Sequence, residues 1–246
     1  MDDSGTLAVG VDVGGTFTDA VVVVDGEVTT AKVPTTETEQ SEGVLRSIDV
    51  ACDAAGVAPE QIEQFRHAMT VSTNALLEET GATTALVTTA GFGDVLAIGR
   101  QNRPALYDTR AERPDPLVPA KRRYELDERA TPAGIERSVD EDELAAVADA
   151  LAASDADSVA VSLLHAYAHP ENERAVARRL RERLDATVVA SHETLAAVRE
   201  YERTATTVAD AYVTPVIDDY LGRLSEAASE RGLPPVRIMQ SNGGIA

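Results

Sequence analysis

The 246-residue sequence is poor in cysteine and in aromatic side chains, with one cysteine, no tryptophan, six tyrosines and three phenylalanines. A single cysteine, Cys52, excludes an intrachain disulfide and is typical of a protein kept in a reducing compartment. No apolar run approaches the roughly 20 residues that a membrane-spanning helix needs. Residues 1–10 are acidic near the start and lack the basic end and long apolar stretch of a signal peptide. These absences predict a cytoplasmic protein.

Positive charge is also scarce. The chain has 22 lysines and arginines against 42 aspartates and glutamates, which gives a formal net charge of −20. Nucleic acids and anionic membranes are polyanions, so this charge argues against both as partners. Only two of the basic residues, Lys32 and Lys121, are lysines. Dense carboxylates with few lysines are typical of proteins from salt-loving organisms, in which salt screens the repulsion between the acids. We therefore expect a halophilic source.

The most informative segment is Asp12–Asp19, which reads Asp-Val-Gly-Gly-Thr-Phe-Thr-Asp and joins two apolar, β-branched runs. A P-loop would need a Gly-Lys pair that opens a helix, and the sequence contains no such pair. A dinucleotide fingerprint would need a third glycine that leads into a helix, whereas Ala20–Val24 has the pattern of a strand. A β-hairpin whose glycine turn binds an anion remains, with a plain hairpin turn as the alternative.

Within that turn, the backbone N–H groups from Gly14 through Gly15 to Thr16 are the predicted phosphate donors, because glycine permits close approach and positive φ. The hydroxyls of Thr16 and Thr18 would add two side-chain donors. Asp12 lies near enough along the chain to orient a water or a hydrated Mg²⁺. Asp12 is therefore the predicted metal-binding residue.

After the hairpin, helices and strands alternate along the chain. A second turn at Asp25–Gly26 leads into a strand at 27–33, which completes an antiparallel meander. Five prolines within residues 102–135 predict an irregular surface excursion. A long helix is expected over 197–230, with a kink at Pro215. The other expected elements are helices at 37–55, 72–80, 92–99, 140–153 and 171–184 and strands at 66–70, 83–88, 157–164, 186–190 and 236–240.

This order of elements describes an α/β fold, a mixed sheet with an antiparallel three-strand meander and flanking helices. It resembles the ribonuclease H-like half-domain of the actin-like ATPase superfamily, in which the first hairpin holds nucleotide phosphates. Two such halves close over ATP in that superfamily, and this chain is long enough for one.

Four further segments carry a closer resemblance and, with the hairpin, run nearly the full length of the chain. They are His67–Glu78, Gly91–Asp108, Ser191–Glu193 with Arg199–Thr207, and Gln240–Gly244. In this order they resemble the hydantoinase A/5-oxoprolinase family, which includes N-methylhydantoinase A subunits, ATP-dependent 5-oxoprolinases and acetone carboxylase β-subunits. The resemblance implies an N-terminal ribonuclease H-like domain at 1–190 and the start of a truncated main domain at 191–246.

Several polar residues in these segments are candidates for the substrate side of a site. His67 is expected at the C-terminal end of its strand, facing the crevice where open α/β sheets bind ligands, and it could polarise a carbonyl, shuttle a proton or cap the strand. Asn74 lies at a helix N-terminus, a position that suits either an anion or ordinary capping. Arg100 and Arg103 could clamp a carboxylate or phosphate, or form surface ion pairs. With the resemblance, we predict all four as catalytic residues.

The resemblance implies an ATP-dependent hydrolase that acts on a cyclic amide such as a hydantoin or 5-oxoproline, with ATP and Mg²⁺ as cofactors. It also implies a partner hydantoinase B-type subunit and an oligomeric assembly. Family members are several hundred residues longer, so the chain is expected to be an N-terminal fragment. Two alternatives stay open: an acetone-carboxylase-type subunit that uses ATP to activate a ketone, and a non-catalytic fragment that serves as an assembly module.

Overall fold

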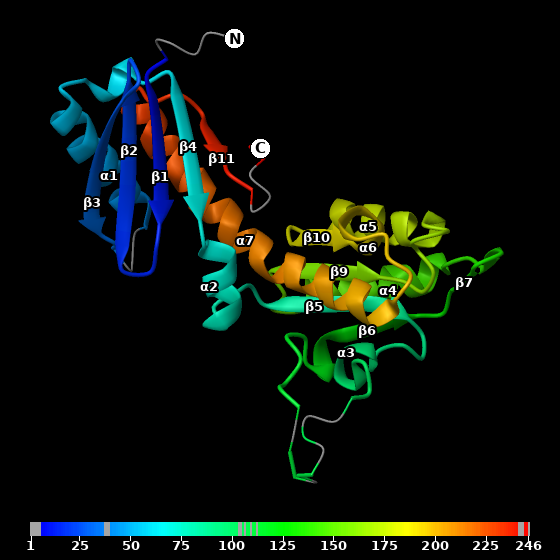
Figure 1. Ribbon diagram of the computed structural model, residues 1–246. Coiled ribbons are helices and arrows are strands. Elements are labelled where there is room, and N and C mark those ends of the chain that lie inside the picture. The colour runs from blue at the N-terminus through cyan, green and yellow to red at the C-terminus, as the bar shows by residue number, and fades with distance from the viewer. Residues whose placement is uncertain are drawn as a thin grey trace. The chain divides into compact units, whose positions relative to one another are not determined.

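The computed structural model describes residues 6–36, 40–102, 105, 107–108, 110–111, 113–240 and 244–245. The chain forms two compact units, one of Met1–Leu77 with Val216–Ala246 and one of Glu78–Pro215 (Figure 1). The second unit is an insertion into the first, and helix α7 (Glu200–Glu230) continues from one to the other through Pro215. These units do not coincide with the predicted division at residue 190, because α7 returns the chain to the first unit.

The first unit contains a five-stranded mixed sheet in the order β11-β4-β1-β2-β3. The expected meander is present: β2 pairs antiparallel with both β1 and β3, and the β2–β3 turn falls at the Asp25–Gly26 signal. β4 lies parallel to β1 and to β11. The strands are β1 (Ala8–Val13), β2 (Phe17–Val24), β3 (Glu27–Pro34), β4 (Gln64–Met69) and β11 (Val236–Ile238).

The core of this unit follows from the period-2 pattern of its strands. Alternate side chains of β1 and β2, such as Val11 and Val22, point to one face and are buried. Helix α1 (Gln40–Ala55) and the second half of α7 pack in the same cluster, with Ile48 and Leu224 fully buried. Cys52 of α1 is buried there as well, and burial raises the pKa of its thiol to about 11. A short helix, α2 (Val71–Leu77), and a 3₁₀ turn, η1 (Pro59–Gln61), complete the unit.

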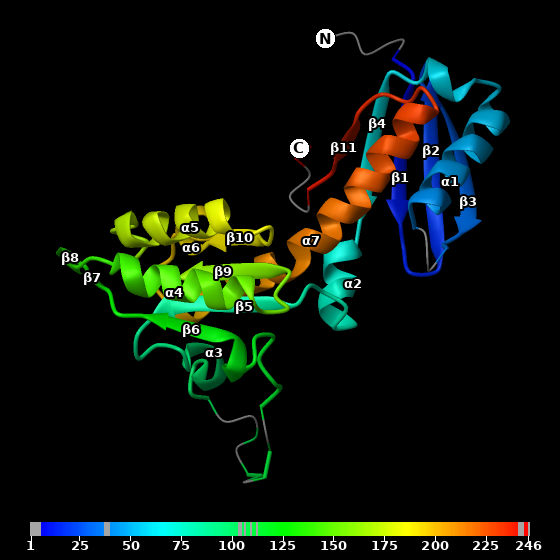
Figure 2. The ribbon, with the colours of Figure 1, turned by 180° about the vertical axis from the view of Figure 1, so that it is seen from behind.

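The second unit contains a parallel four-stranded sheet in the order β10-β9-β5-β6. Every residue of β5 (Thr84–Thr89) and β9 (Ser158–Ser162) is buried, as expected when helices cover both faces of a parallel sheet. Helices α4 and α5 share one apolar cluster with these strands, and the first half of α7 packs in another (Figure 2). The remaining elements are α3 (Val95–Ile98), η2 (Ala120–Arg122), β6 (Arg123–Leu126), β7 (Arg129–Thr131), β8 (Gly134–Arg137), α4 (Glu141–Ala152), α5 (Glu171–Arg183), β10 (Thr187–Ala190) and α6 (Ser191–Thr194).

The α/β class, the mixed sheet and the meander are confirmed, with two corrections of detail. Strands β5, β6, β9 and β10 form a separate parallel sheet instead of extending the mixed one, because helices of the second unit bury their apolar residues on both faces. Residues 102–135 are not wholly irregular, since β6 and β7 lie within them. Pro119 precedes β6 and Pro132 lies in the β7–β8 turn, so neither removes a hydrogen-bond donor from a strand.

None of the helices within the described ranges combines the length and the apolar character that a bilayer crossing demands.

Candidate functional site

The turn between β1 and β2 is held from its inner side by hydrogen bonds to the end of β3. The N–H of Gly14 donates to the carbonyl of Phe17 at 3.0 Å. The hydroxyl of Thr35 donates to the carbonyl of Gly14 at 2.9 Å, and the N–H of Thr35 donates to the carbonyl of Thr16 at 3.0 Å. Thr18 is fully buried, with its hydroxyl 3.1 Å from that of Thr35. The turn therefore has a fixed shape with two of its carbonyls occupied.

These contacts change the roles of two predicted phosphate donors. The N–H of Gly14 is already bonded within the turn, so it is not free for an anion. The hydroxyl of Thr18 faces the core, where it supports Thr35. Gly15 and Thr16 are exposed, and in the described chain their N–H groups donate to no protein acceptor. A Cβ at Gly15 would meet nothing within 4 Å, so the space before this backbone is open.

Asp12 is the last residue but one of β1 and is exposed. Its neighbour across the pair with β2 is Asp19, which is itself bound to Lys32 with an oxygen-to-nitrogen distance of 2.7 Å. No cation of the described chain pairs with Asp12. A free carboxylate next to exposed amide donors is the donor set that a hydrated Mg²⁺ and a phosphate require. The residues present fit these groups.

Two residues that follow β4 lie beside the same turn. Because β1 and β4 are parallel, their carboxyl ends meet at one edge of the sheet. The hydroxyl of Thr70 donates to the carbonyl of Val13 at 3.3 Å, directly before Gly14. The side-chain amide of Asn74 lies 3.5 Å from the hydroxyl of Thr70, and Asn74 is half-buried. Asn74 is thus connected through Thr70 to the residue before the β1–β2 turn.

His67 lies in the core of the first unit. Its ring has no exposed surface, with Nδ1 3.2 Å from the carbonyl oxygen of Val11 and Nε2 2.7 Å from the hydroxyl of Tyr220. Burial lowers the pKa of His67, and burial raises the pKa of Tyr220. Both ring nitrogens have partners and no substrate can reach them. His67 is therefore a structural residue, and we no longer assign it a catalytic role.

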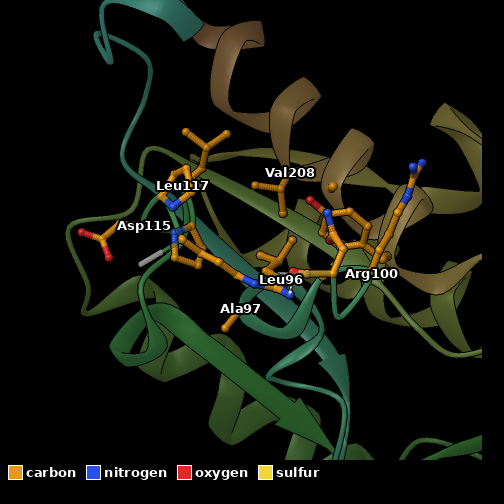
Figure 3. A pocket seen from close by; sticks show the side chains of 13 residues that line it. Leu96, Ala97, Arg100, Asp115, Leu117 and Val208 are labelled. Carbon is orange, nitrogen blue, oxygen red and sulfur yellow. Dashed lines mark hydrogen bonds between the residues drawn. The ribbon is translucent and has the colours of Figure 1, made fainter. Parts of the chain in front are cut away.

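In the second unit, Arg100 lines a pocket of about 640 Å³ (Figure 3). Figure 3 shows Leu96 and Val208 in the middle of the pocket wall, Arg100 to one side, and Leu117 and Asp115 to the other. The wall comprises Leu96, Ala97, Gly99, Arg100, Asn102, Arg113, Pro114, Asp115, Pro116, Leu117, Tyr201, Ala205 and Val208. The predicted residue Arg103 lies outside the described residues.

The two arginines of this pocket differ in their hydrogen-bond partners. The Arg100 Nε donates to the carboxylate of Glu202 on α7. The guanidinium of Arg113 donates to the carbonyls of Ile98 and Asn102, and so satisfies the last carbonyl of α3. Gly99 has φ +56°, and a Cβ there would lie 3.0 Å from Nη1 of Arg113. A glycine at this position lets the arginine reach the helix end.

Two buried charged residues of the second unit gave a weak signal or none in the sequence. Glu173 is fully buried and accepts hydrogen bonds from the hydroxyl of Ser191, from the N–H of Leu163 and from the backbone and ring of His192. Arg203 is 1% exposed, and burial lowers its pKa. Arg203 shares one face of α7 with Arg199 and Thr207 by its i, i+4 spacing, whereas Glu173 belongs to a charge-rich helix in which nothing distinguishes it.

The fold and the hairpin together define the chain as a ribonuclease H-like half of an actin-like ATPase fold. The chain belongs to the hydantoinase/oxoprolinase family. The model of the hydantoinase/oxoprolinase N-terminal region matches residues 8–184, and the hydantoinase/oxoprolinase model matches residues 203–246.

Named relatives show the same relationship. Caprolactamase subunit alpha of Pseudomonas jessenii is 33% identical over 96% of this chain and 36% of its own length. The crystal structure of the ATP-dependent caprolactamase from that organism matches with a TM-score of 0.87 and 31% identity, over 97% of this chain and 36% of the other. The nucleotide-free structure of acetone carboxylase, from work on ATP-dependent acetone carboxylation, matches with a TM-score of 0.85 and 28% identity, over 98% and 37%. This chain thus spans just over a third of these relatives.

Proposed function

We propose that this chain supplies the phosphate-binding half of an enzyme that uses ATP to hydrolyse a cyclic amide. The observation that carries the proposal is the β1–β2 turn. Within the described residues, the N–H groups of Gly15 and Thr16 have no acceptor and the exposed carboxylate of Asp12 has no cationic partner. Family membership and the similarity to an ATP-dependent caprolactamase support the same reaction class.

The residues of this chain would position the nucleotide phosphates and the metal, and would balance their charge. An amide is a poor electrophile because resonance stabilises it. Bound ATP with Mg²⁺ would supply a phosphoryl group to the carbonyl oxygen, which makes the carbonyl carbon electrophilic enough for water to add. The C–N bond would then break with the ring nitrogen leaving as the amine, and a second water would hydrolyse the acyl phosphate to carboxylate and phosphate. Gly15 and Thr16 would hold phosphate oxygens through their N–H groups, and Asp12 would hold a water of the metal. Asn74 would add a donor from α2. Thr35 and Thr18 fix the turn, so that these donors are oriented before the nucleotide arrives.

The assembly belongs to the same proposal. The caprolactamase relative is named as a subunit, and ring opening would then be completed in an oligomer with a hydantoinase B-type partner. A second candidate reaction is ATP-dependent activation of a ketone, which the similarity to acetone carboxylase favours.

ADP formation by the protein with its copurifying subunits separates these reactions. We expect the rate to rise when a lactam or hydantoin is added and to stay at its basal level with acetone and bicarbonate. Asp12→Asn should abolish the increase. Asp25→Asn, the same substitution in the exposed β2–β3 turn, should leave it unchanged. A rate that rises only with ketone and bicarbonate would overturn the cyclic amide and favour the carboxylase.

A further inference from the structure

The pocket of the second unit has the size and composition of a small-molecule site. Its volume of about 640 Å³ lies within the roughly 300–1,000 Å³ typical of such sites. Leu96, Ala205 and Val208 come from α3 and α7, and Leu117 comes from the segment that leads into β6. Most of the wall is therefore apolar, which suits a ligand with a hydrocarbon ring.

Among the polar side chains that line the pocket, Arg100 offers hydrogen-bond donors. Its Nε donates to Glu202, which fixes the plane of the guanidinium. No acceptor in the described chain takes a hydrogen bond from Nη1 or Nη2 of Arg100. Two oriented donors are therefore left for an external oxygen. Arg113 differs, because two backbone carbonyls already occupy its Nη atoms.

Asn102, two residues after Arg100, can pair with both polar groups of an amide. Asn102 lines the pocket, and its side-chain amide carries both a donor and an acceptor. A cyclic amide presents one carbonyl acceptor and one N–H donor on adjacent atoms, with methylene groups around the rest of the ring. The arginine donors match the ligand's carbonyl, the Asn102 amide can pair with its N–H group, and the apolar wall suits its methylene groups.

We propose that this pocket binds the cyclic amide, with its carbonyl oxygen accepting from Arg100 Nη and its methylenes against Leu96, Leu117 and Val208. The proposal rests on the proposed function, and it makes the inserted unit the substrate-recognition part of the chain. The same two donors would hold the carboxylate of the ring-opened product more tightly than the lactam, because an ionised acceptor strengthens the hydrogen bond.

The test uses calorimetry and amide NMR on the 246-residue chain without ATP, with ε-caprolactam and 5-oxoproline as probes. We expect at least one probe to bind and to shift the amide signals of residues 96–102 and 201–208. Arg100→Met keeps the aliphatic stem, and loss of its charged donor should weaken binding roughly tenfold to a hundredfold. Ala205→Phe fills the pocket from a half-buried helix position and should abolish binding.

The control is Arg122→Met, which removes a surface arginine of the same unit that pairs with Asp155 and should leave the affinity unchanged. Binding that shifts other residues, or that survives both pocket variants, overturns the pocket and leaves the proposed reaction standing. Absence of binding by either probe, while ATP·Mg²⁺ shifts Gly15 and Thr16, also overturns the pocket alone. Probe binding in the pocket with no nucleotide response at the hairpin would support the pocket and count against the proposed function.

Discussion

Replacing Tyr220 by phenylalanine would remove one hydroxyl from the core of the first unit. The carbonyl of Val11 can only accept a hydrogen bond, so Nδ1 of His67 carries the proton of the neutral ring. Nε2 is then an acceptor, and the hydroxyl of Tyr220 donates to it at 2.7 Å. Tyr220→Phe leaves this nitrogen without a donor in a site that excludes water. The ring of residue 220 still fills the same volume, so the loss is confined to the hydrogen bond.

The expected cost is the desolvation penalty of an unsatisfied buried acceptor, about 1–3 kcal/mol in the free energy of unfolding. Urea denaturation followed by circular dichroism measures it. Tyr107→Phe is the matched control, since Tyr107 is 98% exposed and its hydroxyl should contribute nothing measurable. A change below about 0.5 kcal/mol for Tyr220→Phe, similar to surface substitutions, would refute the reasoning and mean that water reaches His67.

Three other stability measurements follow from the structure. Burial makes the pKa of His67 lower in the folded chain than the ordinary 6.5. The stability that the neutral ring contributes to the fold is therefore fully present above pH 6.5 and is lost as the pH falls from 6.5 through the folded-state pKa. Denaturation at several pH values should show a slope of up to about 1.4 kcal/mol per pH unit that His67→Gln removes, and an unchanged slope would contradict this. Gly99→Ala should cost about 1–2 kcal/mol by thermal unfolding, because φ is +56° and Arg113 lies 3.0 Å from the new Cβ. Gly222→Ala, at an exposed position of α7 with open space, should instead stabilise by about 0.5–1 kcal/mol, and the same sign for both glycines would contradict the account.

Local patterns were sufficient to predict most of the elements. The alternating valines of β1, the β-branched run of β2 and the Asp25–Gly26 turn specify a meander, because side-chain direction in a strand has a period of two. The same patterns do not say which strands share a sheet. β5 and β9 each have an apolar centre flanked by threonine or serine, and the separate sheet that they form depends on helices far along the chain.

At the candidate site, too, the local sequence predicts the turn but not the distant residues that contact it. The glycine turn was predicted from consecutive residues, and the structure shows it between β1 and β2 with Asp12, Gly15 and Thr16 exposed. The partners that decide individual roles lie elsewhere in the sequence. Thr35 occupies the inner side of the turn, and Tyr220, which is 153 residues from His67, turns a predicted catalytic histidine into a core residue.

The central claim is that the β1–β2 turn holds nucleotide phosphates, and an amide NMR titration of the ¹⁵N-labelled chain with ATP·Mg²⁺ tests it most directly, even if binding is weak. The account predicts that the signals of Gly15 and Thr16 shift most and that Gly14, whose N–H is bonded to Phe17, responds less. Asp12→Asn should reduce these shifts when Mg²⁺ is present. Saturating nucleotide that leaves Gly15 and Thr16 unmoved, or that shifts only residues outside the first unit, would contradict the claim.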